Sequence, residues 1–142
     1  MDYEKFYKEL FAPLEEKYGV LDEDTITSFV GFSAGGPVSL SKIEDKNLYV
    51  TCELAVYPDQ RVSSEGLKFE LFSIGSHSDD WCRTVFTAIG ELSFEAELGD
   101  RHKINITGLV EGPEATDKIQ LHLFSKTKIG NETYGLYEVV DV

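Results

Sequence analysis

Apolar residues recur at three- and four-residue intervals near the start of the chain, the spacing that lines one face of a helix. The members of this stripe are Tyr3, Phe6, Tyr7, Leu10, Phe11, Leu14 and Tyr18. Pro13 removes a backbone hydrogen-bond donor, so we expect either one helix kinked near Ala12 or two short helices. Gly19 suits the C-terminal cap of this segment. The apolar face should pack on a second layer.

From about residue 25 onward, most of the chain alternates or is rich in β-branched and aromatic residues, which is typical of strands. The clearest run is NLYVTCELAVY, residues 47–57, with one face expected to carry Leu48, Val50, Cys52, Leu54 and Val56. A turn with Pro58 and Asp59 leads to LKFELFSI, residues 67–74, so these two runs should form neighbouring antiparallel strands. The remaining predicted strands are 25–32, 102–110, 118–126 and 133–140.

The stretch GSHSDDWCRT, residues 75–84, predicts the start of a second helix. Ser78 can accept a backbone N–H as the N-terminal cap, and Asp79 and Asp80 would lie in the first turn, where the helix dipole favours carboxylates. Trp81 opens an apolar stripe that should pack on the sheet. Its other members are Val85, Ala88, Ile89 and Leu92.

The predicted order is helix, strands, helix, strands. Two helices cannot supply the crossovers of a parallel sheet, so this order favours an α+β fold with a mostly antiparallel sheet packed against two helices. The chain has 142 residues, of which 42% are hydrophobic, enough for a buried core and close to the usual size of one domain. We therefore expect residues 1–142 to form a single domain.

The segment GFSAG, residues 31–35, matches the G-x-S-x-G nucleophile elbow of serine hydrolases. An elbow requires a helix directly after the serine, whereas residues 36–39, GPVS, should interrupt regular structure. We favour a glycine-rich turn between strands. A small hydrolase that uses Ser33 is the less favoured alternative.

The three histidines, His77, His102 and His122, share no short spacing typical of metal ligands, and we expect no metal and no cofactor. His77 and Asp79 stand close enough in the sequence to raise the alternative of acid–base catalysis. Catalytic groups face one another in space, however, and near neighbours in sequence usually point apart. We therefore assign Asp79 to helix capping and expect no catalytic residues, while the role of His77 stays open.

The formal net charge of −13 argues against nucleic acid or an anionic membrane as a partner. It suits a basic protein partner, although acidity also serves solubility alone. No run is long and apolar enough to cross a bilayer, and the N-terminus is charged, so we expect a soluble cytoplasmic protein. Cys52 and Cys82 are expected to be reduced thiols there.

From about residue 47 to the end, the chain resembles the suppressor-of-fused-like domain family. The similarity rests on YVTCELAVYP and LKFELFSI, on DDWCRTVFTAIGEL around Trp81, and on LGDRHKINITG with its Gly99 and Asp100. The late runs KIQLHLFSK and YGLYEVVDV look like the paired terminal strands of that family. The resemblance implies a binding domain without catalytic residues: animal members sequester a transcription factor, and many bacterial relatives are regarded as immunity proteins of polymorphic toxin systems. We do not carry the transcription-factor role over to a chain of this length.

We therefore expect a non-enzymatic protein-binding domain, an immunity protein that neutralises a toxin. A basic toxin domain would suit its acidity. The alternative is a regulatory or structural interaction domain with a host-cell partner. Acidic loop residues could contribute to binding, or could be no more than solvated loop positions: Asp22, Glu23, Asp24, Glu44, Asp45 and Asp59. The sequence assigns neither the identity of the partner nor an oligomeric state.

Overall fold

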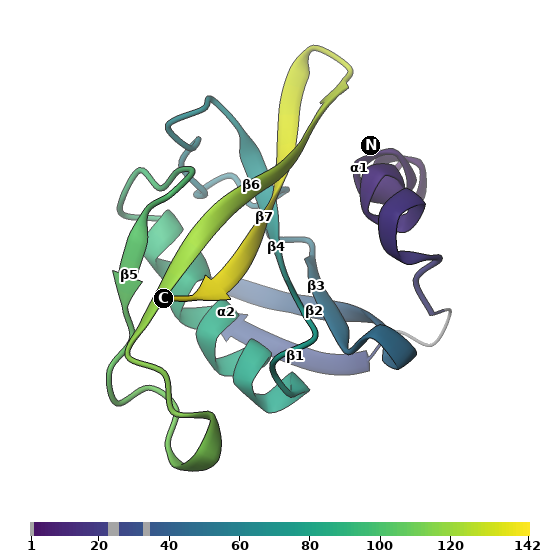
Figure 1. The fold of residues 1–142 in the computed structure, drawn as a ribbon. Coiled ribbons are helices and arrows are strands. Elements are labelled where there is room, and N and C mark those ends of the chain that lie inside the picture. Colours follow the sequence, from purple (N-terminus) through teal and green to yellow (C-terminus); the bar gives the residue numbers. More distant parts are fainter. Residues whose placement is uncertain (1, 23–25, 33–34) are drawn as a thin grey trace.

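The computed structural model describes residues 2–22, 26–32 and 35–142, with side chains for residues 2–22 and 39–142. Its helices are α1 (Tyr3–Tyr18) and α2 (Asp79–Ser93), with short 3-10 turns η1 (Glu44–Lys46) and η2 (Gly112–Glu114). Its strands are β1 (Ile26–Phe32), β2 (Gly35–Ile43), β3 (Leu48–Cys52), β4 (Lys68–Ile74), β5 (Lys103–Asn105), β6 (Lys118–Ile129) and β7 (Glu132–Asp141). Figure 1 shows the two α-helices on either side of the sheet.

In the described part of the chain, the strands form one sheet in the order β1-β2-β3-β4-β7-β6-β5. Only the central pair, β4 and β7, is parallel, with Lys68 opposite Tyr134 and Phe72 opposite Glu138. All other neighbours are antiparallel. The predicted α+β fold, with a mostly antiparallel sheet and two helices, is confirmed.

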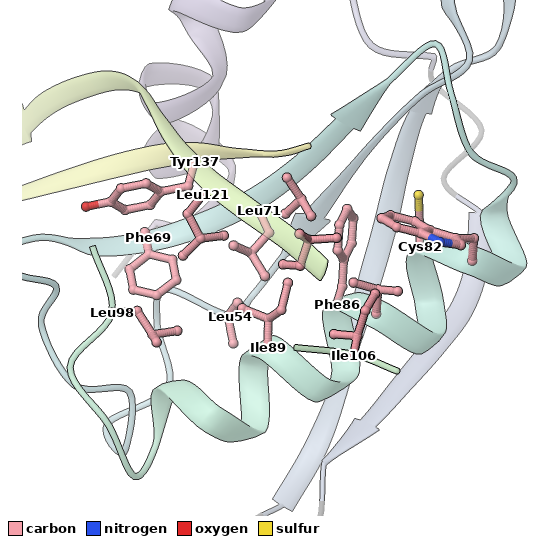
Figure 2. Close-up of a cluster of buried hydrophobic side chains, with 14 of the residues drawn as sticks. Leu54, Phe69, Leu71, Cys82, Phe86, Ile89, Leu98, Ile106, Leu121 and Tyr137 are labelled. Atoms are coloured by element: carbon pink, nitrogen blue, oxygen red, sulfur yellow. The ribbon is translucent and has the colours of Figure 1, made fainter. Parts of the chain in front are cut away.

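Each face of the sheet is covered by one helix, which gives the molecule two hydrophobic cores. α1 buries Phe6, Leu10, Phe11 and Leu14 in a core shared with the sheet. Its sheet members include Leu48, Val50, Phe72 and Leu136. On the other face α2 packs on Phe69, Leu71, Leu121 and Tyr137, as Figure 2 shows. Because both faces are covered, the middle of β4 is buried at every position.

Both predicted helices are present. α1 is a single helix with Pro13 inside it, capped by the Asp2 carboxylate, which accepts the N–H of Lys5, and ended by Gly19 at a φ of 109°. In α2, Trp81, Val85 and Ile89 are buried as expected, and Ala88 and Leu92 are half-buried. The predicted neighbours β3 and β4 are antiparallel.

Three details of the strand prediction were wrong. The strand expected over residues 47–57 ends at Cys52, because Glu53 adopts a left-handed φ of 81° and the chain turns. Leu54 consequently joins the α2 core instead of the α1 core. The strand expected over 102–110 is reduced to Lys103–Asn105. Residues 36–39, expected to interrupt regular structure, lie in β2, and residues 39–43 pair with β3.

Candidate functional site: a cleft beside helix α1

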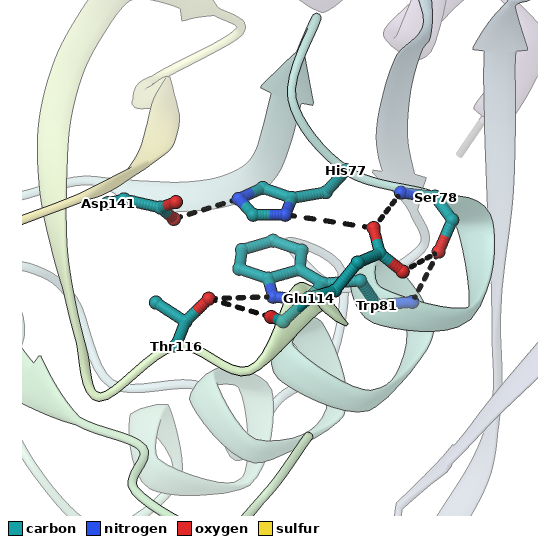
Figure 3. Close-up of polar contacts among 6 residues, drawn as sticks. All are labelled: His77, Ser78, Trp81, Glu114, Thr116 and Asp141. Carbon is teal, nitrogen blue, oxygen red and sulfur yellow. Dashed lines mark hydrogen bonds and ion pairs between the residues drawn. The ribbon is translucent and has the colours of Figure 1, made fainter. Parts of the chain in front are cut away.

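The stretch that opens α2 forms a polar junction that ties three distant segments together (Figure 3). Its members are His77, Ser78, Trp81, Glu114, Thr116 and Asp141, and we call them the His77 junction. Ser78 caps α2, since its Oγ accepts the N–H of Trp81 at 3.3 Å, which confirms its predicted role. The N–H and hydroxyl of Ser78 donate to the Glu114 carboxylate at 2.8 and 2.6 Å. These two hydrogen bonds lower the pKa of Glu114 below its ordinary value.

His77, whose role sequence reasoning left open, is the centre of this junction. Its ring stacks on Trp81, with centroids 3.5 Å apart and planes 6° apart, and only 7% of its surface is exposed. Nε2 lies 2.8 Å from Oδ1 of Asp141, and Nδ1 lies 3.9 Å from Oε1 of Glu114. Both ring nitrogens therefore face carboxylates of the same chain. A general base needs a nitrogen directed at its substrate, so this geometry favours a structural clamp.

Asp79 and Asp80 lie in the first turn of α2, as expected. Asp80 forms an ion pair with Arg83, one turn further along the helix. The carboxylates that meet His77 are those of Asp141 and Glu114, not that of Asp79. Sequence reasoning missed both partners because they lie 64 and 37 residues away in the chain.

Ser33 lies outside the described residues. The segment that follows it, from Gly35, is strand β2 and not a helix, as the predicted turn between strands requires.

His102 is exposed, and His122 contacts Gln120 at 2.8 Å. Among the described residues, no group of three or more His, Cys, Asp or Glu side chains is placed to hold a metal ion. The helices described are also too short or too polar to span a membrane.

Among the described residues, the predicted acidic partner-binding positions lie at opposite ends of β3. Asp22 accepts the N–H of Glu44 at 3.0 Å, so Asp22, Glu44 and the exposed Asp45 lie together just before β3. Asp59 is exposed in the turn that follows the opposite end of β3. Glu23 and Asp24 lie outside the described residues.

A cleft of about 470 Å³ lies between the first turns of α1 and the strands β2 and β3. It is lined by Tyr3, Glu4, Tyr7, Ser39, Ser41, Cys52, Glu53 and Val56, and we call it the α1 cleft. Its size falls in the range of about 300–1,000 Å³ that is common for ligand sites. Among the described residues, its lining contains two carboxylates and no Lys, Arg or His.

Glu70, a fully buried carboxylate on β4, holds the residues that form the wall of the α1 cleft from the interior of the protein. Thr51 Oγ1 and Leu54 N donate to its Oε1 at 2.6 and 3.1 Å, and Tyr7 Oη and Ala55 N donate to its Oε2 at 2.7 Å each. Burial raises the pKa of Glu70 to about 7, although these hydrogen bonds act in the opposite direction. Glu70 thus joins α1, β3 and the turn after β3.

Glu53 is held at the rim of the cleft by the same network. Its N–H donates to Tyr7 Oη at 2.6 Å, and its φ of 81° is a conformation that residues other than glycine rarely adopt. The hydrogen bonds to Tyr7 and Glu70 offset this strain. Sequence reasoning missed this site because β3 was expected to continue through Glu53.

The chemistry of the cleft favours binding over covalent catalysis by its one thiol. Burial raises the pKa of Cys52 to about 12, so the thiol stays protonated at neutral pH and is a poor nucleophile. Its Sγ lies 3.3 Å from Ser41 Oγ. Glu4 and Glu53 are exposed, and neither has an ion-pair partner within the described part of the chain. Unpaired carboxylates beside phenol rings are suited to a cation.

Comparison with known proteins adds no assignment. The chain matches no protein-family model, no curated protein and no solved structure. The candidate site therefore rests on its own geometry.

Proposed function

We propose that the chain is a non-enzymatic protein-binding domain whose partner is a basic protein, and that it acts as an immunity protein that neutralises a toxin. The observation that carries the proposal is the α1 cleft, whose rim presents the carboxylates of Glu4 and Glu53 without ion-pair partners among the described residues. The net charge of −13 supports it, because a strongly acidic protein attracts a basic partner over long distances.

The resemblance to suppressor-of-fused-like domains supports the same proposal, since many bacterial relatives in that family are regarded as immunity proteins. The blocks that carry the resemblance contain the strands β3 to β7 and the helix α2. The motif LGDR, for example, contacts strand β6 and the turn before β4: the Asp100 carboxylate accepts the N–H of Leu123 at 2.8 Å, and the Asp100 N–H donates to Glu65 at 2.9 Å. These contacts hold the fold, and the proposed binding surface is the α1 cleft, whose lining includes Cys52 and Glu53 of the first block.

The test is co-expression with the product of the adjacent reading frame, followed by purification and a growth assay. We expect a stable complex, protection from toxicity, and an association rate that falls about tenfold or more between about 50 and 500 mM salt. Binding without protection would instead favour a regulatory or structural interaction domain. Absence of both binding and protection would contradict the proposal.

A further inference from the structure

We propose that the α1 cleft binds an arginine side chain of the partner, with Tyr3 and Glu53 as the residues that determine this specificity. This inference rests on the proposed function only for the source of the arginine. The cleft itself is a property of the chain and can be tested without a partner.

The charges around the cleft favour a cation over an anion. Glu4 lies on α1 and Glu53 in the turn after β3, so two different elements each contribute a carboxylate to the lining of the cleft. The positive end of the α1 dipole also faces this region, but Asp2 caps that end and Glu4 lies in its first turn. These two acidic residues offset the positive end of the dipole. The Glu53 carboxylate lies outside α1 and adds further negative charge to the cleft.

The aromatic residues of the cleft favour arginine over lysine. Tyr3 is 54% exposed, an unusual position for a large aromatic side chain, and it lines the cleft together with Tyr7. A guanidinium group is planar and stacks on aromatic rings, and its five N–H donors can reach several acceptors at once. The cleft offers the hydroxyl groups of Ser39 and Ser41 as well as the carboxylates. An ammonium group would use fewer of these contacts.

The backbone that carries Glu53 is ordered before any ligand binds. Tyr7 Oη holds the Glu53 N–H, and Glu70 holds the N–H groups of Leu54 and Ala55. A rigid wall loses little conformational entropy on binding, so a single anchoring side chain can contribute more to affinity. The Tyr7 hydroxyl donates a hydrogen bond to the buried Glu70, so changing Tyr7 would disturb the core. Tyr3 and Glu53 are the residues that can be changed without doing so.

The test uses three blocked tripeptides, Gly-Arg-Gly, Gly-Lys-Gly and the uncharged isostere Gly-citrulline-Gly, titrated into the intact protein and followed by amide NMR shifts. We expect the arginine peptide to shift the amides of Tyr3, Glu4 and Glu53. Binding of the lysine peptide should be about fivefold weaker, and the citrulline peptide should cause no saturable shift. Equal shifts from the arginine and citrulline peptides, or none from either, would overturn the proposal. Equal affinity for the lysine peptide would overturn the preference for arginine.

Matched variants locate the site. Glu53→Gln and Tyr3→Ala should each weaken binding of the arginine peptide about tenfold or more. Glu97→Gln removes the same charge at an exposed loop position away from the cleft and should change binding less than twofold. Equal effects of Glu53→Gln and Glu97→Gln would show that only net charge matters and would overturn the site.

The same variants separate this inference from the proposed function. If the toxin partner binds Glu53→Gln and Tyr3→Ala as tightly as the unaltered protein, the arginine site is wrong and the binding function stands. If the arginine peptide binds in the cleft but no partner protects growth, the site stands and the immunity function is wrong.

Discussion

Glu70 is the residue on which the α1 side of the molecule depends, because one buried carboxylate meets four donors from three segments. Two effects act on the charge of this carboxylate in opposite directions. Burial disfavours its charge, while each hydrogen bond from a donor favours it. The net result is a pKa raised to about 7 from an ordinary value of 4.5.

This raised pKa predicts how stability depends on pH. The folded state keeps its proton where the unfolded state has already lost it, so the contribution of Glu70 is fully present below about pH 4.5 and is lost as pH rises through about 7. The full change is on the order of 3 kcal/mol of unfolding free energy. Chemical denaturation between pH 4.5 and 8 measures it.

Glu70→Gln is the variant that isolates this effect. It should flatten the pH dependence and also destabilise the protein by about 1–3 kcal/mol, since an amide cannot accept all four hydrogen bonds. Glu97→Gln, at an exposed position, should leave the pH slope unchanged. The same slope in Glu70→Gln as in the unaltered protein would show that Glu70 does not carry it.

At the scale of elements, the start of α2 is where local and distant contacts combine. Ser78→Ala removes the cap and the hydrogen bond to Glu114, and should lower the unfolding free energy by about 1–2 kcal/mol. Ser76→Ala, at an exposed position two residues earlier, should change it by less than about 0.5 kcal/mol. Chemical denaturation at neutral pH tests both.

Ser78→Asp separates the cap from the junction. Aspartate is as good a cap as serine, but it cannot donate a side-chain hydrogen bond to the Glu114 carboxylate and would repel it. We expect a loss comparable to that of Ser78→Ala at neutral pH. This loss should shrink in acid. The pKa of Glu114 is lowered in the folded protein, so the stability contributed by its hydrogen bonds with Ser78 is present above the ordinary carboxyl pKa and disappears as pH falls. An unchanged denaturation midpoint for Ser78→Asp would mean that capping alone matters.

The elements also show where sequence-based prediction succeeds. α1 and the start of α2 were predicted because their stripes and caps depend on residues within four positions of one another. The end of β3 was not, because Glu53 turns where Tyr7 and Glu70 bind its loop, 46 and 17 residues away in the chain. The role of His77 was missed for the same reason. Contacts between distant segments determine both sites, and no local pattern in the sequence predicts such contacts.

At the scale of the whole molecule, the dominant feature is the net charge of −13. Exposed carboxylates repel one another in the folded state, and this repulsion is larger when the chain is compact than when it is unfolded. Salt screens it, since the Debye length falls from roughly 20 Å to about 7 Å between about 20 and 200 mM. The described ion pairs do not oppose this trend strongly, because most lie at the surface, where such pairs contribute little.

We therefore predict that salt stabilises the isolated protein, by on the order of 1 kcal/mol between about 20 and 200 mM NaCl, which corresponds to a rise of about 2–6 °C in Tm. Glu95→Lys with Glu97→Lys changes the net charge by four, from −13 to −9, at two exposed positions after α2. This double variant should be more stable in low salt and should gain less from added salt. A fall in Tm with salt, or the same gain in the double variant, would show that self-repulsion does not limit stability. Attraction of a basic partner would then remain as the role of the acidic surface.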